Sequence, residues 1–360
     1  MSAPVPVVDC DVHCVPASIE ALFPYLDEHW VGFIANGMLG MPAALGAMYP
    51  PGAATSATAE ARAASGPPGT SLDAVREQVL DRHGVDVAVL SCITGFDAIR
   101  NTYYGGDLLR AVNDWQAAEW LDRDPRLRGS IVVPPLDPEA AVREIHRLED
   151  DPRFVRVLLP VRADAPYGNR RYHAIYAAAA ERGLAIALHA WGLSGAQPTP
   201  NGFSEHYIED YVAHTIIAQG HLTSLVVEGV FQRFGDLRVS LLECGSTWLP
   251  AYLWRLDKDW KGIRREVPWV DRRPSELLRE HLRVSVAPLH APADLEQLDE
   301  LMATLDWPEL LMFASDHPHD HGDGAARFLA RLSGEQRAAV MGGNAAAHYR
   351  LGAVVGGRGD

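Results

Sequence analysis

Eight short apolar segments, each followed by a segment with helical character, predict a single (β/α)₈ barrel for this chain. Strands that alternate with helices pair in parallel through right-handed crossovers, and eight such strands close economically into a barrel. Gly84 and Gly183 end two of the helical segments in the manner of C-terminal cap glycines. An open, doubly wound sheet is the alternative, but no glycine-rich nucleotide loop follows any of the eight segments.

The expected strands are rich in β-branched residues and leucine, and they cover residues 7–13, 85–91, 128–133, 155–159, 184–189, 237–243, 282–287 and 310–316. The expected helices cover residues 72–83, 108–123, 138–148, 172–182 and 248–260, with a closing helix that starts at Ser333 in a capping box with Gln336. Residues 24–71 are rich in Gly, Ala, Met and Pro, and we expect a lid-like insertion there. We expect one domain over residues 1–360.

Composition excludes several classes of function. With 48% hydrophobic and 22% charged residues the chain has an ordinary globular composition, while its net charge of −15 argues against a nucleic-acid partner. No apolar run predicts a membrane span and no secretory signal is present, so we expect a cytoplasmic protein. Four cysteines in a chain of this length do not predict a disulfide framework.

Polar residues stand at the carboxyl ends of several predicted strands, where the chemistry of such barrels takes place. They are Asp11 and His13 after the first strand, His189 after the fifth, Glu243 after the sixth and Asp316 after the eighth. Asp11 and His13 are two positions apart and therefore point to the same face of an extended strand. Two carboxylates and two imidazoles in this ring are a plausible ligand set for Zn²⁺, Mn²⁺ or Fe²⁺.

The chain resembles the amidohydrolase superfamily, in the branch that holds aminocarboxymuconate semialdehyde decarboxylase and the nonoxidative aromatic decarboxylases. Five stretches carry the resemblance in family order, namely 9–13 (DCDVH), 187–190 (ALHA), 242–250 (LECGSTWLP), 313–319 (FASDHPH) and 343–346 (GNAA). They span nearly the whole chain, so they are specific for the family and much less specific for the reaction.

The resemblance implies that Asp11, His13, His189 and Asp316 hold one divalent ion, with Zn²⁺ as our first choice and Mn²⁺ or Fe²⁺ as alternatives. Binuclear relatives use a carboxylated lysine at the end of the fourth strand. This chain has no lysine there, so we expect a single ion. Many relatives have a histidine where Glu243 stands. Glu243 could accept a proton, bind a substrate N–H, orient His189, or be a purely structural carboxylate.

Two reactions suit such a site. Our first expectation is hydrolysis of a small cyclic or aromatic carboxylate-type substrate by a metal-activated water, with Asp316 as general acid and base. The alternative is nonoxidative decarboxylation, in which Asp316 protonates a ring carbon and CO₂ leaves. A metal-stabilised scaffold without catalysis is a third interpretation.

Other residues near the predicted strand ends are candidates for shaping a substrate pocket: Trp191, Arg162, Tyr103, Tyr104 and His317. Every second residue from 317 to 321, beyond the eighth strand, is a histidine: His317, His319 and His321. We consider three interpretations, namely a second metal-binding tract, a solvated loop and a support for the metal ligands. Trp248, Trp254 and Trp260 are six residues apart and do not form one stripe, so we expect them to pack in the core or between subunits. An aromatic-rich surface and the resemblance to dimeric relatives lead us to expect a homodimer, which binds a small-molecule substrate.

Overall fold

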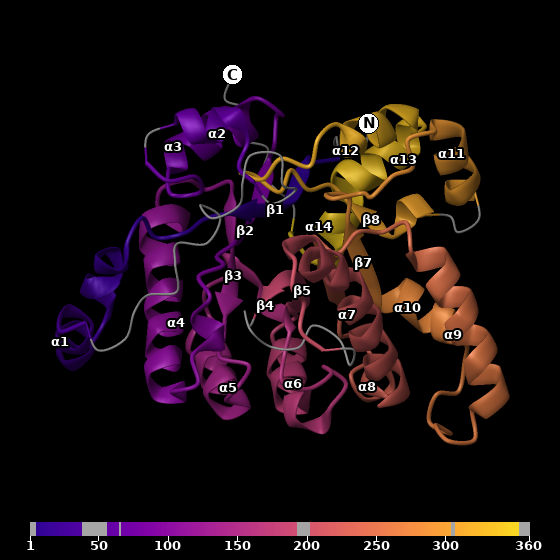
Figure 1. Ribbon diagram of the computed structural model, residues 1–360, viewed down its shortest axis with the longest axis horizontal. Helices are drawn as coiled ribbons and strands as arrows, with labels where there is room; N and C mark the ends of the chain where they lie inside the picture. The colour runs from indigo at the N-terminus through magenta and orange to yellow at the C-terminus, as the bar shows by residue number, and fades with distance from the viewer. Residues whose placement is uncertain (1–4, 38–55, 65, 193–201, 304–306, 353–360) are drawn as a thin grey trace.

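The structure, a computed structural model, describes residues 5–37, 56–64, 66–192, 202–303 and 307–352 of the 360-residue chain. Its centre is a sheet of eight parallel strands in the order β1-β2-β3-β4-β5-β6-β7-β8 (Figure 1). The strands are β1 (Val8–His13), β2 (Val87–Ser91), β3 (Leu127–Val132), β4 (Phe154–Arg162), β5 (Ala185–Gly192), β6 (Val239–Leu242), β7 (Leu282–Ser285) and β8 (Leu311–Met312).

Helices surround this sheet. They are α1 (Glu28–Ala35), α2 (Ala59–Ala63), α3 (Leu72–Val75), α4 (Thr102–Gln116), α5 (Pro138–Arg147), α6 (His173–Glu181), α7 (Tyr207–Val227), α8 (Val230–Arg233), α9 (Leu249–Ile263), α10 (Pro274–His281), α11 (Leu295–Ala303), α12 (Gly324–Arg331), α13 (Gly334–Ala338) and α14 (Asn344–His348). Short 3₁₀ turns cover Ile19–Tyr25, Phe96–Ala98, Arg170–Tyr172 and Trp307–Glu309, and π-helical turns cover Arg76–Asp81, Ala117–Leu121 and Ala339–Gly343.

The barrel closes between its first and last strands. The Cys10 amide donates to the Phe313 carbonyl at 2.9 Å, and the Asp316 amide donates to the Asp11 carbonyl at 3.0 Å. Residues of the strands are almost all buried, as expected for parallel strands covered by helices. The predicted eight-stranded barrel is confirmed, and its closure places the end of β1 next to the segment that follows β8.

Some predicted boundaries are wrong. The eighth strand ends at Met312 instead of Asp316, because the chain beyond it bends and Asp316 adopts a left-handed backbone conformation. Helix α4, predicted over residues 108–123, starts six residues earlier at Thr102. The Asn101 side chain accepts a hydrogen bond from the Tyr104 amide and caps the first turn of this helix. The predicted capping box between Ser333 and Gln336 is confirmed.

The predicted insertion at 24–71 lies partly outside the described residues, which omit 38–55 and 65. Its described parts include the helices α1 and α2. Its second part reaches the segment after β8, where the Thr58 amide donates to the Pro318 carbonyl and Ala57 forms an antiparallel bridge with His319. The lid role and the single domain over 1–360 stay predictions. Within the described part of the chain, no helix is long and apolar enough to span a membrane.

Candidate metal centre

Four side chains from the two ends of the chain and its middle converge at the carboxyl end of the barrel. Asp11 and His13 come from β1, His189 from β5 and Asp316 from the segment after β8. One ligand atom from each lies within 4.8 Å of the others, and all four residues are buried. The structure therefore brings together the four residues that we predicted as ligands.

The contacts within this group leave room for a cation. His13 Nε2 lies 2.8 Å from Asp316 Oδ1. His189 Nε2 lies 3.1 Å from Asp11 Oδ2, yet these two atoms, with His189 Nδ1, have no hydrogen-bond partner among the described residues. Buried polar atoms nearly always have a hydrogen-bond partner. Unpartnered metal-ligating atoms that face one another at this spacing therefore fit a bound cation. Two oxygens and two nitrogens are a donor set that Zn²⁺, Mn²⁺ and Fe²⁺ accept.

The protonation states of the group also suit a metal, which needs ionised carboxylates and neutral imidazoles. Burial alone would raise the pKa of Asp11, but the adjacent His189 outweighs it and lowers that pKa. Burial opposes the ionisation of Asp316 in the same way, but His319 and His13 hold its pKa well below the usual range. Burial lowers the pKa of His13, although Asp316 partly opposes this shift.

The histidines beyond β8 gather around Asp316. His319 Nδ1 lies 3.2 Å from Asp316 Oδ2, and His321 Nε2 is hydrogen-bonded to the same oxygen. Asp316 raises the pKa of His319 even though burial opposes the charged form. Of the three interpretations of this tract, support for Asp316 agrees best with the contacts. A second set of potential ligand atoms, all within 4.8 Å of one another, comes from His13, Glu243, Asp316 and His319. His319 therefore adjoins the predicted metal site.

Glu243 lies on the Nδ1 side of His189, and one of its carboxylate oxygens is also within 4.8 Å of ligand atoms of His13 and Asp316. Its Oε2 is 3.8 Å from His189 Nδ1, and Tyr211 Oη donates to its Oε1 at 3.5 Å. Burial, followed by the charges of Asp316 and Asp11, raises the pKa of Glu243 well above its ordinary value. The 3.8 Å separation is too long for a hydrogen bond, so the orienting role that we considered for Glu243 stays a prediction.

Backbone strain concentrates at the same rim. Glu243, His290 and Asp316 have φ values of 56°, 55° and 54°, in the left-handed region that non-glycine residues seldom adopt. The three residues follow β6, β7 and β8. Strained backbone is typical of functional sites, where the surrounding structure holds it in place.

Of the predicted pocket residues, Trp191 lies close to the metal group and Arg162 lies at the end of the neighbouring strand β4. The Trp191 ring is 5.4 Å from the His189 ring, centroid to centroid, and its Nε1 donates to Asp97 Oδ1 at 2.9 Å. Arg162 ends β4 and forms a 2.6 Å ion pair with Asp210 at the start of α7. Its Nε is buried without a hydrogen-bond partner among the described residues. Asp97 was missed by sequence reasoning; burial raises its pKa to about 6.

The remaining three candidates differ in their surroundings. His317 is buried beside the group, and burial together with His13 and His319 lowers its pKa to about 4. Tyr103 and Tyr104 lie in the first turn of α4 and not on a loop as expected. Tyr103 is 84% exposed, whereas Tyr104 is buried against Trp30. No observation tests substrate contact by these residues, and the place of the two tyrosines gives that prediction no support.

A hollow of about 600 Å³ opens at the mouth of the barrel beside His321 and His290, and Ser56 of the insertion also lines it. His321 contacts Asp316, so the wall of this hollow reaches the metal group.

The comparisons with known proteins agree with this geometry. The family model described as Amidohydrolase matches residues 8–351, so the chain belongs to the amidohydrolase family, and it is an enzyme of that family. The predicted resemblance is confirmed.

Its relatives include decarboxylases. The chain is 25% identical over 303 residues to gamma-resorcylate decarboxylase from Rhodococcus jostii, covering 77% of this chain and 87% of that one. The crystal structure of 5-carboxyvanillate decarboxylase from Sphingomonas paucimobilis matches with a TM-score of 0.69 at 21% identity, covering 96% and 99% of the two chains. The 5-carboxyvanillate decarboxylase from Novosphingobium aromaticivorans, complexed with manganese and 4-hydroxy-3-methoxy-5-nitrobenzoic acid, matches with a TM-score of 0.71 at 17% identity, covering 96% of each chain.

Proposed function

We propose that this protein is a metal-dependent, nonoxidative decarboxylase of a small aromatic carboxylate that carries an oxygen next to the carboxyl group. The buried group of Asp11, His13, His189 and Asp316 carries the proposal, because it combines a cation site with a proton-carrying carboxylate. The names of the relatives support decarboxylation over hydrolysis, which was our first expectation from the sequence.

One divalent ion fits the four ligands. When bound, it would supply positive charge toward the carboxylate and the neighbouring oxygen substituent of the substrate. We expect Mn²⁺ to serve, because the donor set contains two hard oxygens and a relative was crystallised with manganese. Zn²⁺, our first choice from the sequence, stays an untested alternative.

Asp316 is the proton donor in this proposal: it is ionised in the free site and receives a proton from His319 before it acts on the ring carbon. Its proton forms a new C–H bond at the ring carbon that bears the carboxyl group. The C–C bond then breaks, its electron pair restores the aromatic ring, and the carboxyl group leaves as CO₂. His319, 3.2 Å from Asp316 Oδ2 and with a raised pKa, is placed to return a proton to Asp316 after each turnover.

The walls of the site suit a planar anion. Trp191 offers an aromatic face beside His189, and its hydrogen bond to Asp97 fixes the ring. Arg162 keeps an unpaired Nε for a substrate oxygen. Glu243, 3.8 Å from His189 Nδ1, stands where many relatives have a histidine.

Hydrolysis remains the second candidate, since Glu243 cannot act as a cation toward the substrate as the histidine of many relatives could. The two reactions are separated by incubating the metal-loaded protein with 2,6-dihydroxybenzoate and related ortho-hydroxybenzoates, and in parallel with simple aromatic lactones and amides. We expect release of CO₂ with formation of the phenol. Opening of lactones or amides without CO₂ release would assign hydrolysis instead.

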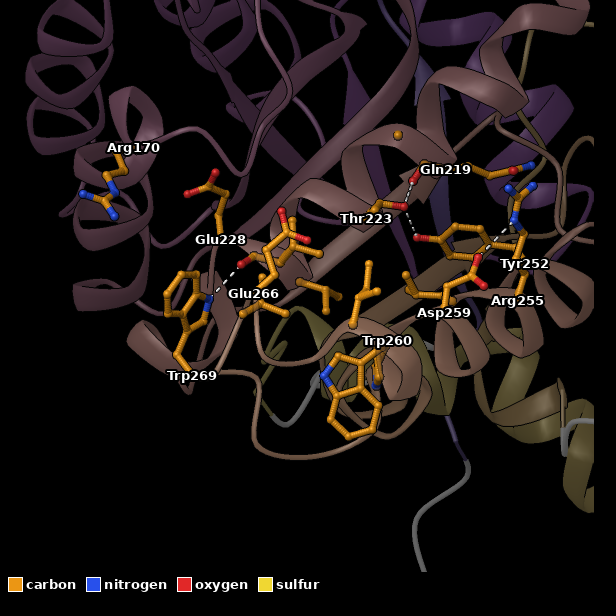
Figure 2. A pocket seen from close by; sticks show the side chains of 17 residues that line it. Arg170, Gln219, Thr223, Glu228, Tyr252, Arg255, Asp259, Trp260, Glu266 and Trp269 are labelled. Carbon is orange, nitrogen blue, oxygen red and sulfur yellow. Dashed lines mark hydrogen bonds and ion pairs between the residues drawn. The ribbon is translucent and has the colours of Figure 1, made fainter.

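We also propose a homodimer. Among the described residues, large exposed apolar side chains concentrate on α7, α9 and the turn after α9: Ile208, Val212, Ile216, Trp254, Ile263 and Trp269. Figure 2 shows Trp260 and Trp269 beside the groove of about 680 Å³ between α7 and α9.

A second copy of the chain is the partner that the charges favour. Exposed Glu205 and Glu209 lie just before and within the first turn of α7. Helix α9 carries exposed Arg255, Lys258 and Lys261. Its exposed Asp259 lies 3.5 Å from both Arg255 and Lys258, which leaves Lys261 as the one of these three bases without an ion pair among the described residues. An antiparallel two-fold contact would bring the acidic end of one copy to Lys261 of the other. Light scattering of the wild type is expected to give a dimer, and V212E/I216E a monomer, with the exposed Y103E as control. A monomeric wild type would refute the proposal.

The cytoplasmic location stays a prediction. All four cysteines are free and buried, which agrees with a reducing compartment and does not establish one.

A further inference from the structure

A completely buried arginine lies inside the barrel beside the metal group. The guanidinium of Arg156, on β4, has no exposed surface although arginine is always charged. It donates hydrogen bonds to five oxygens, those of Ser130 Oγ, Cys10 O and Ser91 Oγ at 2.7 Å each, Tyr349 Oη at 3.1 Å and Leu90 O at 3.5 Å. None of these oxygens is charged, so the cation has no carboxylate in direct hydrogen-bond contact among the described residues.

Ser91 links the guanidinium of Arg156 to the carboxylate of Asp11 by two hydrogen bonds. Arg156 Nη2 lies 3.9 Å from Asp11 Oδ1, too far for a hydrogen bond. Ser91 Oγ accepts a hydrogen bond from Arg156 Nη2, which leaves its own proton free, and it donates this proton to Asp11 Oδ1. The order of donors is therefore fixed, from the guanidinium through the hydroxyl to the carboxylate.

The same guanidinium also fixes the main chain of β1. Arg156 Nη1 donates to the carbonyl of Cys10, the residue before Asp11. The guanidinium of Arg156 thus fixes the backbone next to Asp11 directly and the Asp11 carboxylate through Ser91. Asp11 Oδ1 already accepts a hydrogen bond from Ser91. The other oxygen, Asp11 Oδ2, has no hydrogen-bond partner and faces His189 Nε2 at 3.1 Å.

We infer that Arg156, acting through Ser91, is a positioning residue that turns Asp11 Oδ2 toward the metal and makes Asp11 a one-oxygen ligand. This inference rests on the metal site of the proposed function. Residues that hydrogen-bond to a metal-ligating carboxylate orient it, and substituting such residues typically lowers metal affinity by about 10–100-fold. The competing explanation is that Arg156 only fills the barrel interior as part of a polar network.

Two serines separate these explanations, because both contact Arg156 and only one contacts Asp11. Ser91 links the guanidinium to the carboxylate. Ser130 accepts from Arg156 Nε and donates to the carbonyl of Leu90, without contact to a predicted ligand. Ser91→Ala removes the link, and Ser130→Ala is the matched control that removes one bond of the same kind.

The experiment measures Mn²⁺ and Zn²⁺ affinity of wild type, S91A and S130A by competition with a chelator, without any substrate. Thermal unfolding of the metal-free proteins reports the structural cost of each substitution. We expect S91A to bind both ions about 10–100-fold more weakly and S130A to stay within about threefold of the wild type. The electron paramagnetic resonance spectrum of bound Mn²⁺ should also change in S91A, because Asp11 loses its hydrogen bond from Ser91.

The outcomes are distinguishable. Wild-type affinity in S91A, or an equal loss in S130A, overturns the inference while the metal site stands. A wild type that binds no metal overturns the proposed function itself. Arg156→Lys keeps the charge but lacks the planar fork, so a folded R156K is expected to show a loss like that of S91A; undiminished affinity in R156K would also overturn the positioning role.

Discussion

Asparagine at position 316 is the sharpest single perturbation of the proposed chemistry. Asp316→Asn keeps the size of the side chain but replaces the titratable carboxyl group with an amide that can neither ionise nor pass a proton to the substrate. Its oxygens contact His13 at 2.8 Å and His319 at 3.2 Å, so the carboxylate links the metal group to the histidines that would recharge it. Loss of a positioned general acid lowers rates about 10²–10⁴-fold. This corresponds to about 3–6 kcal/mol on the barrier, since each tenfold is about 1.4 kcal/mol.

Because Asp316 is also a predicted ligand, the assay must separate binding from chemistry. Turnover is measured as CO₂ released per bound metal ion, with the metal content of each sample determined in parallel. The exposed carboxylate of Glu335 on α13 gives the control variant E335Q, which should keep the wild-type rate per ion. If D316N with full metal occupancy kept more than about one tenth of the wild-type rate, Asp316 would not be the proton donor.

Three further predictions follow from the surroundings of the site. Arg162→Met is expected to raise KM for the carboxylate substrate about 10–100-fold with little change in kcat, since a charge-assisted hydrogen bond contributes about 1.5–3 kcal/mol; an unchanged KM would exclude substrate contact. Glu243→Gln should bind Mn²⁺ within about threefold of the wild type, because burial keeps the pKa of Glu243 high and the amide resembles the uncharged acid; a loss above about tenfold would contradict this. Asp97→Asn keeps an acceptor for Trp191 Nε1 and removes a carboxyl whose pKa is raised from 3.8 to about 6. The wild type therefore gains stability from this group below pH 4 and loses it as pH rises through 6. Denaturant titrations should show D97N gaining up to about 3 kcal/mol over the wild type between pH 4 and pH 7, from 2.2 pKa units at about 1.4 kcal/mol each; a pH-independent difference would contradict the shift.

The barrel and its metal group could be predicted from the sequence because the fold class constrains both. Once eight strands alternate with helices, the carboxyl ends of all strands meet at one rim, so Asp11, His189 and Asp316 are brought together over about 300 residues without any knowledge of side-chain contacts. The distances, the pairing of His13 with Asp316 and the strained backbone at that rim needed coordinates.

Other features depended on interactions that no local pattern encodes. The two tyrosines at 103 and 104 were expected on a loop, and the cap formed by Asn101 instead places them in a helix. Ser91 and Arg156 were missed because their roles depend on contacts across strands β1, β2 and β4. A signal did exist, since a charged residue inside the buried run Val155–Leu159 requires a polar partner.

The central claim is that one divalent ion binds between Asp11, His13, His189 and Asp316. The most direct test is the metal content, by elemental analysis, of wild type and His189→Ala after reconstitution with Mn²⁺ or Zn²⁺ and removal of free ion. The account predicts one ion per wild-type chain and a large loss in H189A. No bound ion in the wild type, two ions per chain, or full occupancy in H189A would contradict it.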